Sequence, residues 1–243
     1  EYVAIFQNFV PLNQVNLKNK MNQTKCIAAL FDFDGVVMDT ETQYTLFWNQ
    51  ISSKYFPDEK DFGLRIKGQT MTQIYAKHFA GMEDAQREIT EALNRFEREM
   101  AFEYVPGVVR FMQDLRAHGV KIAIVTSSNE QKMAHVYAAH PELKEITDRI
   151  LTAEMFTRSK PAPDCFLLGA EVFDTVKENC VVFEDSFHGL EAGNAAGMAV
   201  VGLCTTNPEE AIRDKCRLVI PDFTNFSFLQ MKALLCLLYT SPS

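Results

Sequence analysis

The stretch Ile27-Ala28-Ala29-Leu30-Phe31-Asp32-Phe33-Asp34-Gly35 decides the fold of this chain, because it joins an apolar run directly to two carboxylates. A continuous apolar run is typical of a strand that is buried on both faces of a parallel sheet. Two aspartates and a glycine continue a strand poorly, but they suit a strand end that holds a divalent metal and attacks a phosphate. Taken alone, the same residues are equally compatible with a polar strand end followed by a turn.

Apolar runs of the same kind recur along the chain, with helical patterns between them. Apolar residues in 108–118 follow a helical spacing that Gly119 ends, and residues 163–173 and 187–196 are also helical in pattern. This alternation predicts a doubly wound, Rossmann-like α/β fold with a parallel sheet and active groups at the carboxyl ends of its strands. After the first strand, at Ile27–Phe33, the predicted strands are Val120–Val125, Ile150–Thr152, Cys180–Phe183, Ala199–Leu203 and Leu218–Ile220.

One segment, residues 41–104, breaks the alternation. It has no strand pattern and several amphipathic helical ones, which predicts an α-helical cap inserted over the end of the first strand. The catalytic core is then predicted to comprise residues 21–40 and 105–235. Residues 1–20 lack the charged start and continuous apolar core of a signal peptide, and Met21 precedes the first strand. We expect residues 1–20 to be a non-native or disordered extension and residues 236–243 to be a non-native tail.

Composition excludes several classes of partner. The chain has 243 residues and a net charge of -8, which argues against a nucleic-acid partner, since phosphate neutralisation needs clustered Lys and Arg. No run reaches the roughly 18 apolar residues of a membrane helix. The six cysteines form no CxxC pair and no zinc spacing, which indicates free thiols in a reducing compartment. These features predict a cytoplasmic protein, and a cap within the same chain favours a monomer.

Three further groups of polar residues lie directly after predicted strands or in the loops that follow them. They are Thr126-Ser127-Ser128-Asn129, Lys160-Pro161 and Glu184-Asp185-Ser186. Each alone has an ordinary explanation: a helix N-cap, a turn, and a solvated strand end. Because the carboxyl ends of parallel strands meet at one edge of a sheet, we expect all three groups to lie near Asp32 and Asp34.

These residue types suit phosphoryl transfer. A carboxylate at the position of Asp32 can attack phosphorus and form an acyl phosphate, and a second carboxylate two residues on can exchange protons with the leaving oxygen and with water. Mg²⁺ prefers hard oxygen ligands, and Asp32, the Asp34 carbonyl and Asp185 would supply them. The hydroxyls and amides at Thr126 and Ser127 hold phosphate oxygens, and Lys160 neutralises charge on the nucleophile and the phosphate together.

The four motifs together resemble the haloacid dehalogenase-like hydrolases, and the resemblance covers about residues 25–222. A helical cap between the first and second motifs is similar to the β-phosphoglucomutase-like branch. The resemblance implies a nucleophile at Asp32 and a general acid/base at Asp34, a residue that the dehalogenases lack. It also implies phosphate binding by Thr126 and Lys160, and an Mg²⁺ site at Asp32, Asp34 and Asp185 that Glu184 supports.

The sequence departs from the mutase pattern at three places. It has Tyr44 where β-phosphoglucomutases carry His, Gln69-Thr70-Met71 where they carry Val-Ser-Arg, and Ser128-Asn129-Glu130 where they carry Ser-Lys-Asn. The chain therefore lacks the His, Arg and Lys side chains that would bind a second phosphate or control proton transfer in a mutase. Their absence at these positions favours an Mg²⁺-dependent phosphatase that acts on a small phosphorylated metabolite. A sugar-phosphate mutase is the alternative, and a non-catalytic binding protein is a third. The residues predicted to contact the leaving group are Tyr44, Lys67, Gly68 and Gln69.

Overall fold

A computed structural model of the protein describes residues 26–67 and 69–236, with the backbone alone at residue 236. The predicted extension at 1–20 lies outside the described residues, as do nearly all of the predicted tail at 236–243 and the predicted substrate contact at Gly68. Within the described part, no helix is long and apolar enough to cross a membrane.

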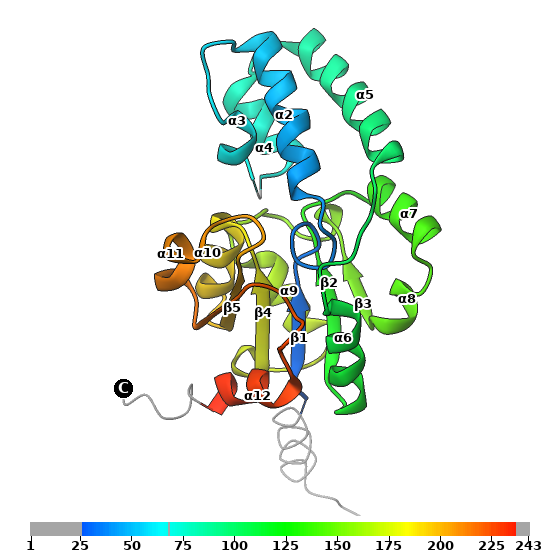
Figure 1. The fold of residues 1–243 in the computed structure, drawn as a ribbon, viewed down its shortest axis with the longest axis vertical. Coiled ribbons are helices and arrows are strands. Elements are labelled where there is room, and N and C mark those ends of the chain that lie inside the picture. Colours follow the sequence, from blue (N-terminus) through cyan, green and yellow to red (C-terminus); the bar gives the residue numbers. More distant parts are fainter. Residues whose placement is uncertain (1–25, 68, 237–243) are drawn as a thin grey trace, which may run out of the picture.

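The described residues form one six-stranded parallel sheet in the order β3-β2-β1-β4-β5-β6, which confirms the predicted doubly wound fold (Figure 1). The strand β1 lies at the centre, paired with β2 on one side and β4 on the other. The strands that carry the predicted motifs are therefore neighbours. The strand bounds are β1 Ala28–Phe31, β2 Lys121–Val125, β3 Arg149–Leu151, β4 Cys180–Glu184, β5 Ala199–Leu203 and β6 Leu218–Ile220.

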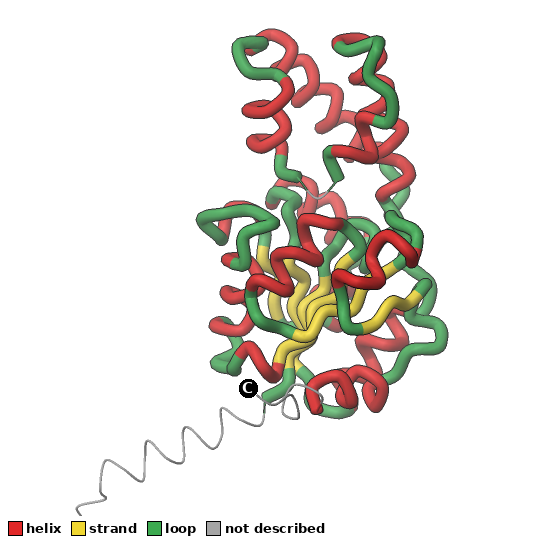
Figure 2. Tube along the Cα trace, turned by 90° about the vertical axis from the view of Figure 1, so that its left-hand side faces the viewer, coloured by secondary structure: helices red, strands yellow, loops and turns green. Residues whose placement is uncertain are grey.

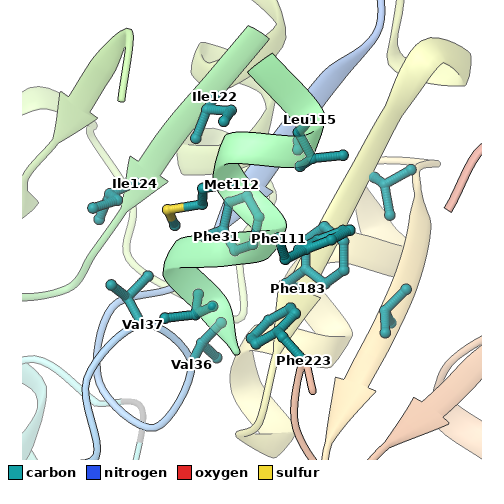
Figure 3. Close-up of a cluster of buried hydrophobic side chains, with 14 of the residues drawn as sticks. Phe31, Val36, Val37, Phe111, Met112, Leu115, Ile122, Ile124, Phe183 and Phe223 are labelled. Carbon is teal, nitrogen blue, oxygen red and sulfur yellow. The ribbon is translucent and has the colours of Figure 1, made fainter. Parts of the chain in front are cut away.

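Both faces of the sheet are buried, which explains why its strands are almost continuously apolar. Along β1, Phe31 belongs to one hydrophobic cluster and Leu30 to another on the opposite face. The first cluster contains Phe111 from helix α6 (Val108–Ala117), which lies edge-on to Phe31 with ring centroids 6.1 Å apart (Figure 3). Phe183 of β4 stacks on Phe31 at 4.5 Å. The central strand is thus held rigidly by aromatic packing.

The helices divide between the two faces of the sheet. Residues of α6, α7 (Glu130–Ala139), α8 (Leu143–Ile146) and α12 (Phe228–Cys236) pack in the first cluster. Residues of α9 (Asp164–Glu171), α10 (Phe187–Ala195) and α11 (Glu209–Ile212) pack in the second. Short 3₁₀ helices lie at η1 Ala153–Met155, η2 Lys177–Asn179 and η3 Arg213–Lys215.

The inserted segment forms a separate helical layer beyond the carboxyl ends of the strands (Figures 1 and 2). Its helices are α2 Glu41–Tyr55, α3 Phe62–Arg65, α4 Met71–His78 and α5 Glu83–Glu99. In α5, Ala85, Ile89 and Leu93 recur every four residues and are buried, while the other side of the helix is charged. Trp48 of α2 is buried in the hydrophobic cluster that contains these three residues.

Two linkers connect the cap to the core and run side by side. The Asp39 N–H donates to the Glu103 carbonyl at 2.8 Å, and the Val105 N–H donates to the Val37 carbonyl at 3.0 Å. The predicted boundaries of 40/41 and 104/105 fall at this pair of linkers, and the division into two domains stays a prediction.

Candidate active site

The polypeptide turns sharply at the carboxyl end of β1. The Asp32 N–H still donates to the Phe183 carbonyl at 3.0 Å, so the sheet fixes the backbone that carries this carboxylate. Three residues later, Gly35 has a φ of +76°, and a Cβ there would lie 2.1 Å from Asp185 Oδ2. Only glycine combines this conformation with so close an approach, and it lets the first and last motifs meet.

A buried lysine joins three of the predicted motifs. Lys160 Nζ donates to Asp32 Oδ1 and Glu184 Oε1 at 2.5 Å each, and all three side chains are buried. Burial raises the pKa of Asp32 to about 8, against the opposing effect of Lys160. Burial lowers the pKa of Lys160, but Asp32 and Glu184 outweigh it and raise that pKa above its usual value. The lysine therefore stays charged.

Three carboxylates at this edge fit a divalent metal. Oxygen atoms of Asp32, Glu184 and Asp185 all lie within 4.8 Å of one another. Burial also raises the pKa of Asp185, and neighbouring carboxylates add to the effect. One ammonium faces three buried carboxylates, so the site has excess negative charge and hard oxygen donors, as Mg²⁺ requires. Asp32 and Asp185 would hold the ion, and Asp34 is not part of this trio of side chains.

The Glu184 carboxylate is held in place by hydrogen bonds from backbone N–H groups. Its Oε2 accepts hydrogen bonds from the Asp185 N–H at 2.9 Å and the Ser186 N–H at 3.0 Å. A Cβ at Gly189 would lie 1.8 Å from Glu184 Oε1, so this glycine lets helix α10 approach the carboxylate. Glu184 does not line the cavity described below, which suits the predicted supporting role.

Asp34 points to a different set of partners. Both of its carboxylate oxygens lie 2.6 Å from Lys132 Nζ, and Ser128 Oγ donates to Oδ2 at 3.0 Å. Thr40 Oγ1 donates to Oδ1. The predicted acid/base carboxylate is thus held by donors from the first cap linker, the second motif and helix α7.

Lys132 is a functional candidate that the sequence analysis missed. Position 129 lacks the lysine of the mutases, yet a lysine from three residues further on reaches the site. The local signal was an N-cap: Asn129 accepts from the Lys132 N–H at 2.8 Å, which places Lys132 in the first turn of α7 beside the second motif.

Two residues of the second motif, Thr126 and Ser127, are predicted to bind phosphate, and they differ in their position relative to the cavity. Ser127 lines the cavity, and its hydroxyl has no hydrogen-bond partner among the described residues. Thr126 lies behind the cavity wall, and its hydroxyl accepts from the Ser128 N–H at 3.0 Å. Ser127 is thus among the residues that line the cavity, whereas Thr126 is not.

A cavity of about 410 Å³ lies between the core and the cap, and its floor includes Asp32, Asp34 and Lys160. Pockets of several hundred Å³ are typical of sites for small molecules. The cap side combines polar residues with an apolar wall made by Trp48, Ile66, Met71, Ile74 and Leu93.

Among the predicted cap contacts, Tyr44, Lys67 and Gln69 all line the cavity. Tyr44 donates its hydroxyl proton to Glu97 Oε1 at 2.8 Å. Lys67 Nζ lies 3.0 Å from Glu41 Oε2, with both side chains largely buried. The Gln69 amide donates to the Arg65 carbonyl at 3.2 Å. The structure brings these three residues to the cavity, and their contact with a substrate stays a prediction.

Comparisons with known proteins agree with this geometry. A family model described as "Haloacid dehalogenase-like hydrolase" matches residues 29–203. The chain is 28% identical over 195 residues to the β-phosphoglucomutase of Bacillus subtilis, covering 74% of this chain and 84% of that protein. It is 32% identical over 193 residues to a probable pseudouridine-5′-phosphatase of Drosophila melanogaster, covering 73% and 80%. The crystal structure of a β-phosphoglucomutase from Clostridium difficile matches with a TM-score of 0.74 and 23% identity, covering 89% of this chain and all of that one.

The chain belongs to the haloacid dehalogenase-like hydrolases. Within them it is similar to the β-phosphoglucomutase-like branch, which confirms the resemblance drawn from the four motifs.

Proposed function

We propose that this protein is an Mg²⁺-dependent phosphatase that hydrolyses a small phosphorylated metabolite through an aspartyl-phosphate intermediate. One observation carries the proposal: the Asp32 carboxylate, the buried Lys160 and the Asp185 carboxylate meet at the floor of a cavity between core and cap. Family membership and relatives named as phosphatases support it.

The first step forms one bond and breaks another. An oxygen of Asp32 attacks phosphorus as the bond from phosphorus to the leaving oxygen breaks, and Asp34 gives a proton to that oxygen. In this proposal Lys160 and Ser127 bind the phosphoryl oxygens, which is supported by their place in the cavity lining beside Asp32. In the second step Asp34 takes a proton from water, which attacks phosphorus and frees Asp32. When bound, Mg²⁺ neutralises phosphate charge beside Asp32 and Asp185.

The charges in the cavity favour a phosphatase over a mutase. Each lysine that lines it is already paired: Lys160 with Asp32, Lys132 with Asp34, and Lys67 with Glu41. The cap adds a further carboxylate at Glu97. A mutase must bind a second phosphate on the far side of the sugar, and the described lining has no unpaired lysine or arginine for it.

The mutase remains the second candidate because β-phosphoglucomutases are among the relatives. A non-catalytic binding protein is disfavoured, since the nucleophile, the phosphate lysine and the metal carboxylates are all present. Cytoplasmic location and a monomeric state stay predictions.

The test is a panel of phosphomonoesters with Mg²⁺, scored for phosphate release and for isomerisation. We expect phosphate release from p-nitrophenyl phosphate and from one or more sugar or polyol phosphates, and loss of release when EDTA is added. Conversion of β-glucose 1-phosphate to glucose 6-phosphate, primed by the bisphosphate, would support the mutase instead. No reaction with any ester would overturn both.

A further inference from the structure

Lys132 occupies an unusual place for a charged side chain. It extends from α7 of the core, and its side chain is 2% exposed. Its ammonium lies 4.5 Å from the centre of the Tyr44 ring, on the cap, and 5.3 Å from the centre of the Phe33 ring. A desolvated cation between two rings is held strongly in place, so Lys132 is a rigid feature where cap and core meet.

The contacts of this ammonium are directed at one group. It lies 2.6 Å from both carboxylate oxygens of Asp34, a two-point contact that fixes the plane of the carboxylate as well as its position. Thr40 and Ser128 each add one hydrogen bond to the same carboxylate. Each hydroxyl contacts one oxygen, whereas Lys132 contacts both and is the charged donor of the three.

We propose that Lys132 is a positioning residue, which holds Asp34 in the orientation that delivers a proton to the leaving oxygen and later removes one from water. The inference rests on the proposed function, in which Asp34 is the general acid/base. Proton transfer requires the donor oxygen within hydrogen-bond reach of the acceptor, and a loss of about 1 Å in placement lowers rates on the order of 10²-fold.

The orientation matters because Asp34 lies close to the junction of core and cap. Asp34 is six residues before Thr40, which directly precedes the first cap helix. Its neighbours Phe33 and Val36 are buried in the core cluster, while its side chain accepts a hydrogen bond from Thr40 at the start of the cap. Because Lys132 is anchored in α7, it ties Asp34 to the core while also packing against the cap residue Tyr44.

The experiment uses two substrates that differ in their need for a proton. The p-nitrophenolate ion leaves phosphorus without protonation, whereas the alkoxide leaving group of glycerol 1-phosphate needs a proton. The first step is measured for each under single-turnover conditions, with enzyme in excess and Mg²⁺ present. The variants are Lys132→Met, which keeps the length of the side chain, and Lys132→Arg, which keeps the charge. Gln131→Met, on an exposed position of the same helix, is the control.

We expect Lys132→Met to slow the first step of glycerol 1-phosphate by on the order of 10²-fold, as loss of general-acid catalysis does. Release of p-nitrophenolate should stay within about threefold of wild type, as expected for a leaving group that needs no proton. Lys132→Arg should restore part of the alkyl rate, and Gln131→Met should match wild type with both substrates.

A second measurement guards against loss of structure. Asp34→Asn should show the same difference between the two substrates. The double variant Lys132→Met/Asp34→Asn should react no more slowly than Asp34→Asn, because the two substitutions remove the same function. The double variant also leaves no unpaired charge from this pair.

Three outcomes would overturn the inference. One is an equal loss with both substrates in a folded Lys132→Met protein. Another is a further loss when Lys132→Met is added to Asp34→Asn. The third is a wild-type protein that hydrolyses p-nitrophenyl phosphate but no alkyl phosphate. Failure of the proposed function looks different, because then the wild-type protein hydrolyses neither substrate.

Discussion

The floor of the cavity and its roof are built by different physical means. On the floor, Asp32 and Lys160 are buried and hydrogen-bonded to each other, and Lys160 also donates to the buried Glu184 just outside the cavity lining. On the roof, α2, α4 and α5 pack through their own aromatic and aliphatic cluster and present an apolar wall with a few polar groups. The floor holds high charge density in a rigid frame, so it defines the chemistry. The roof contributes most of the apolar lining, so changes there should affect which substrate is bound and how tightly.

The largest expected effect is on the floor. Asp32→Asn keeps the volume of the side chain but removes the nucleophile, and we expect turnover of p-nitrophenyl phosphate to fall by about 10³-fold or more. Phosphate release and circular dichroism measure activity and fold. Asp58→Asn, an exposed aspartate of the cap, should behave as wild type. Turnover of a folded Asp32→Asn protein within tenfold of wild type would refute the assignment.

The turn beside the nucleophile should be nearly as sensitive. Gly35→Ala forces a Cβ to within 2.1 Å of Asp185 Oδ2 at a φ of +76°, so the Asp185 carboxylate must move. We expect loss of most activity and a destabilisation of about 1–3 kcal/mol, as for strained backbone, measured by urea unfolding.

Gly119 provides the matched control for this substitution. It has a φ of +73°, but a Cβ there would meet nothing within 4 Å. Gly119→Ala should lower stability by about 1 kcal/mol through backbone strain alone and leave activity unchanged. If both alanine variants were equally active, close packing against Asp185 would not matter.

On the roof, the ion pair of Lys67 and Glu41 should contribute less to chemistry than to binding. Lys67→Met leaves the largely buried Glu41 without its cation, and we expect a destabilisation of about 2 kcal/mol. We also expect a higher KM with a smaller change in kcat, because Lys67 contacts Glu41 and Thr206 rather than Asp32 or Asp34. In the double variant Lys67→Met/Glu41→Gln, stability should recover. A fall in kcat as large as that of Asp32→Asn would place Lys67 in the chemistry instead.

The smallest expected effect concerns Glu97 and depends on pH. Burial raises the pKa of Glu97, while Lys132 and the Tyr44 hydroxyl oppose the shift. The folded protein therefore binds the proton more tightly than the unfolded chain does, so ionisation of Glu97 destabilises the fold as pH rises above its unfolded pKa of about 4.3. Glu97→Gln keeps an acceptor for Tyr44 without that charge.

Urea unfolding at pH 4 and pH 7 measures this difference. The stability of Glu97→Gln relative to wild type should rise between the two pH values, whereas the exposed Glu91→Gln on the same helix should show no such trend. If the stability of Glu97→Gln relative to wild type fell between pH 4 and pH 7, the burial of an ionisable Glu97 would be contradicted.

The strands and the four motifs could be predicted because each depends on neighbours in the chain. Strands buried on both faces need continuous apolar residues, and polar groups at their carboxyl ends meet wherever the sheet is parallel. Lys132 was missed because nothing in a lysine's sequence neighbourhood says where its flexible side chain ends. Its partner Asp34 is far away in the chain and near only in the fold.

The sequence by itself determined the parallel sheet, the inserted helices and the set of reactive groups at one sheet edge, because local apolar patterning and strand ends specify them. The tertiary structure alone decided how those groups pair. It placed Lys160 between Asp32 and Glu184, Lys132 on Asp34, and Lys67 on Glu41. It also placed Ser127 in the cavity lining and left Thr126 outside it, bonded to the Ser128 N–H. Pairing depends on side-chain reach and burial across distant segments, and these exist only once the chain has folded.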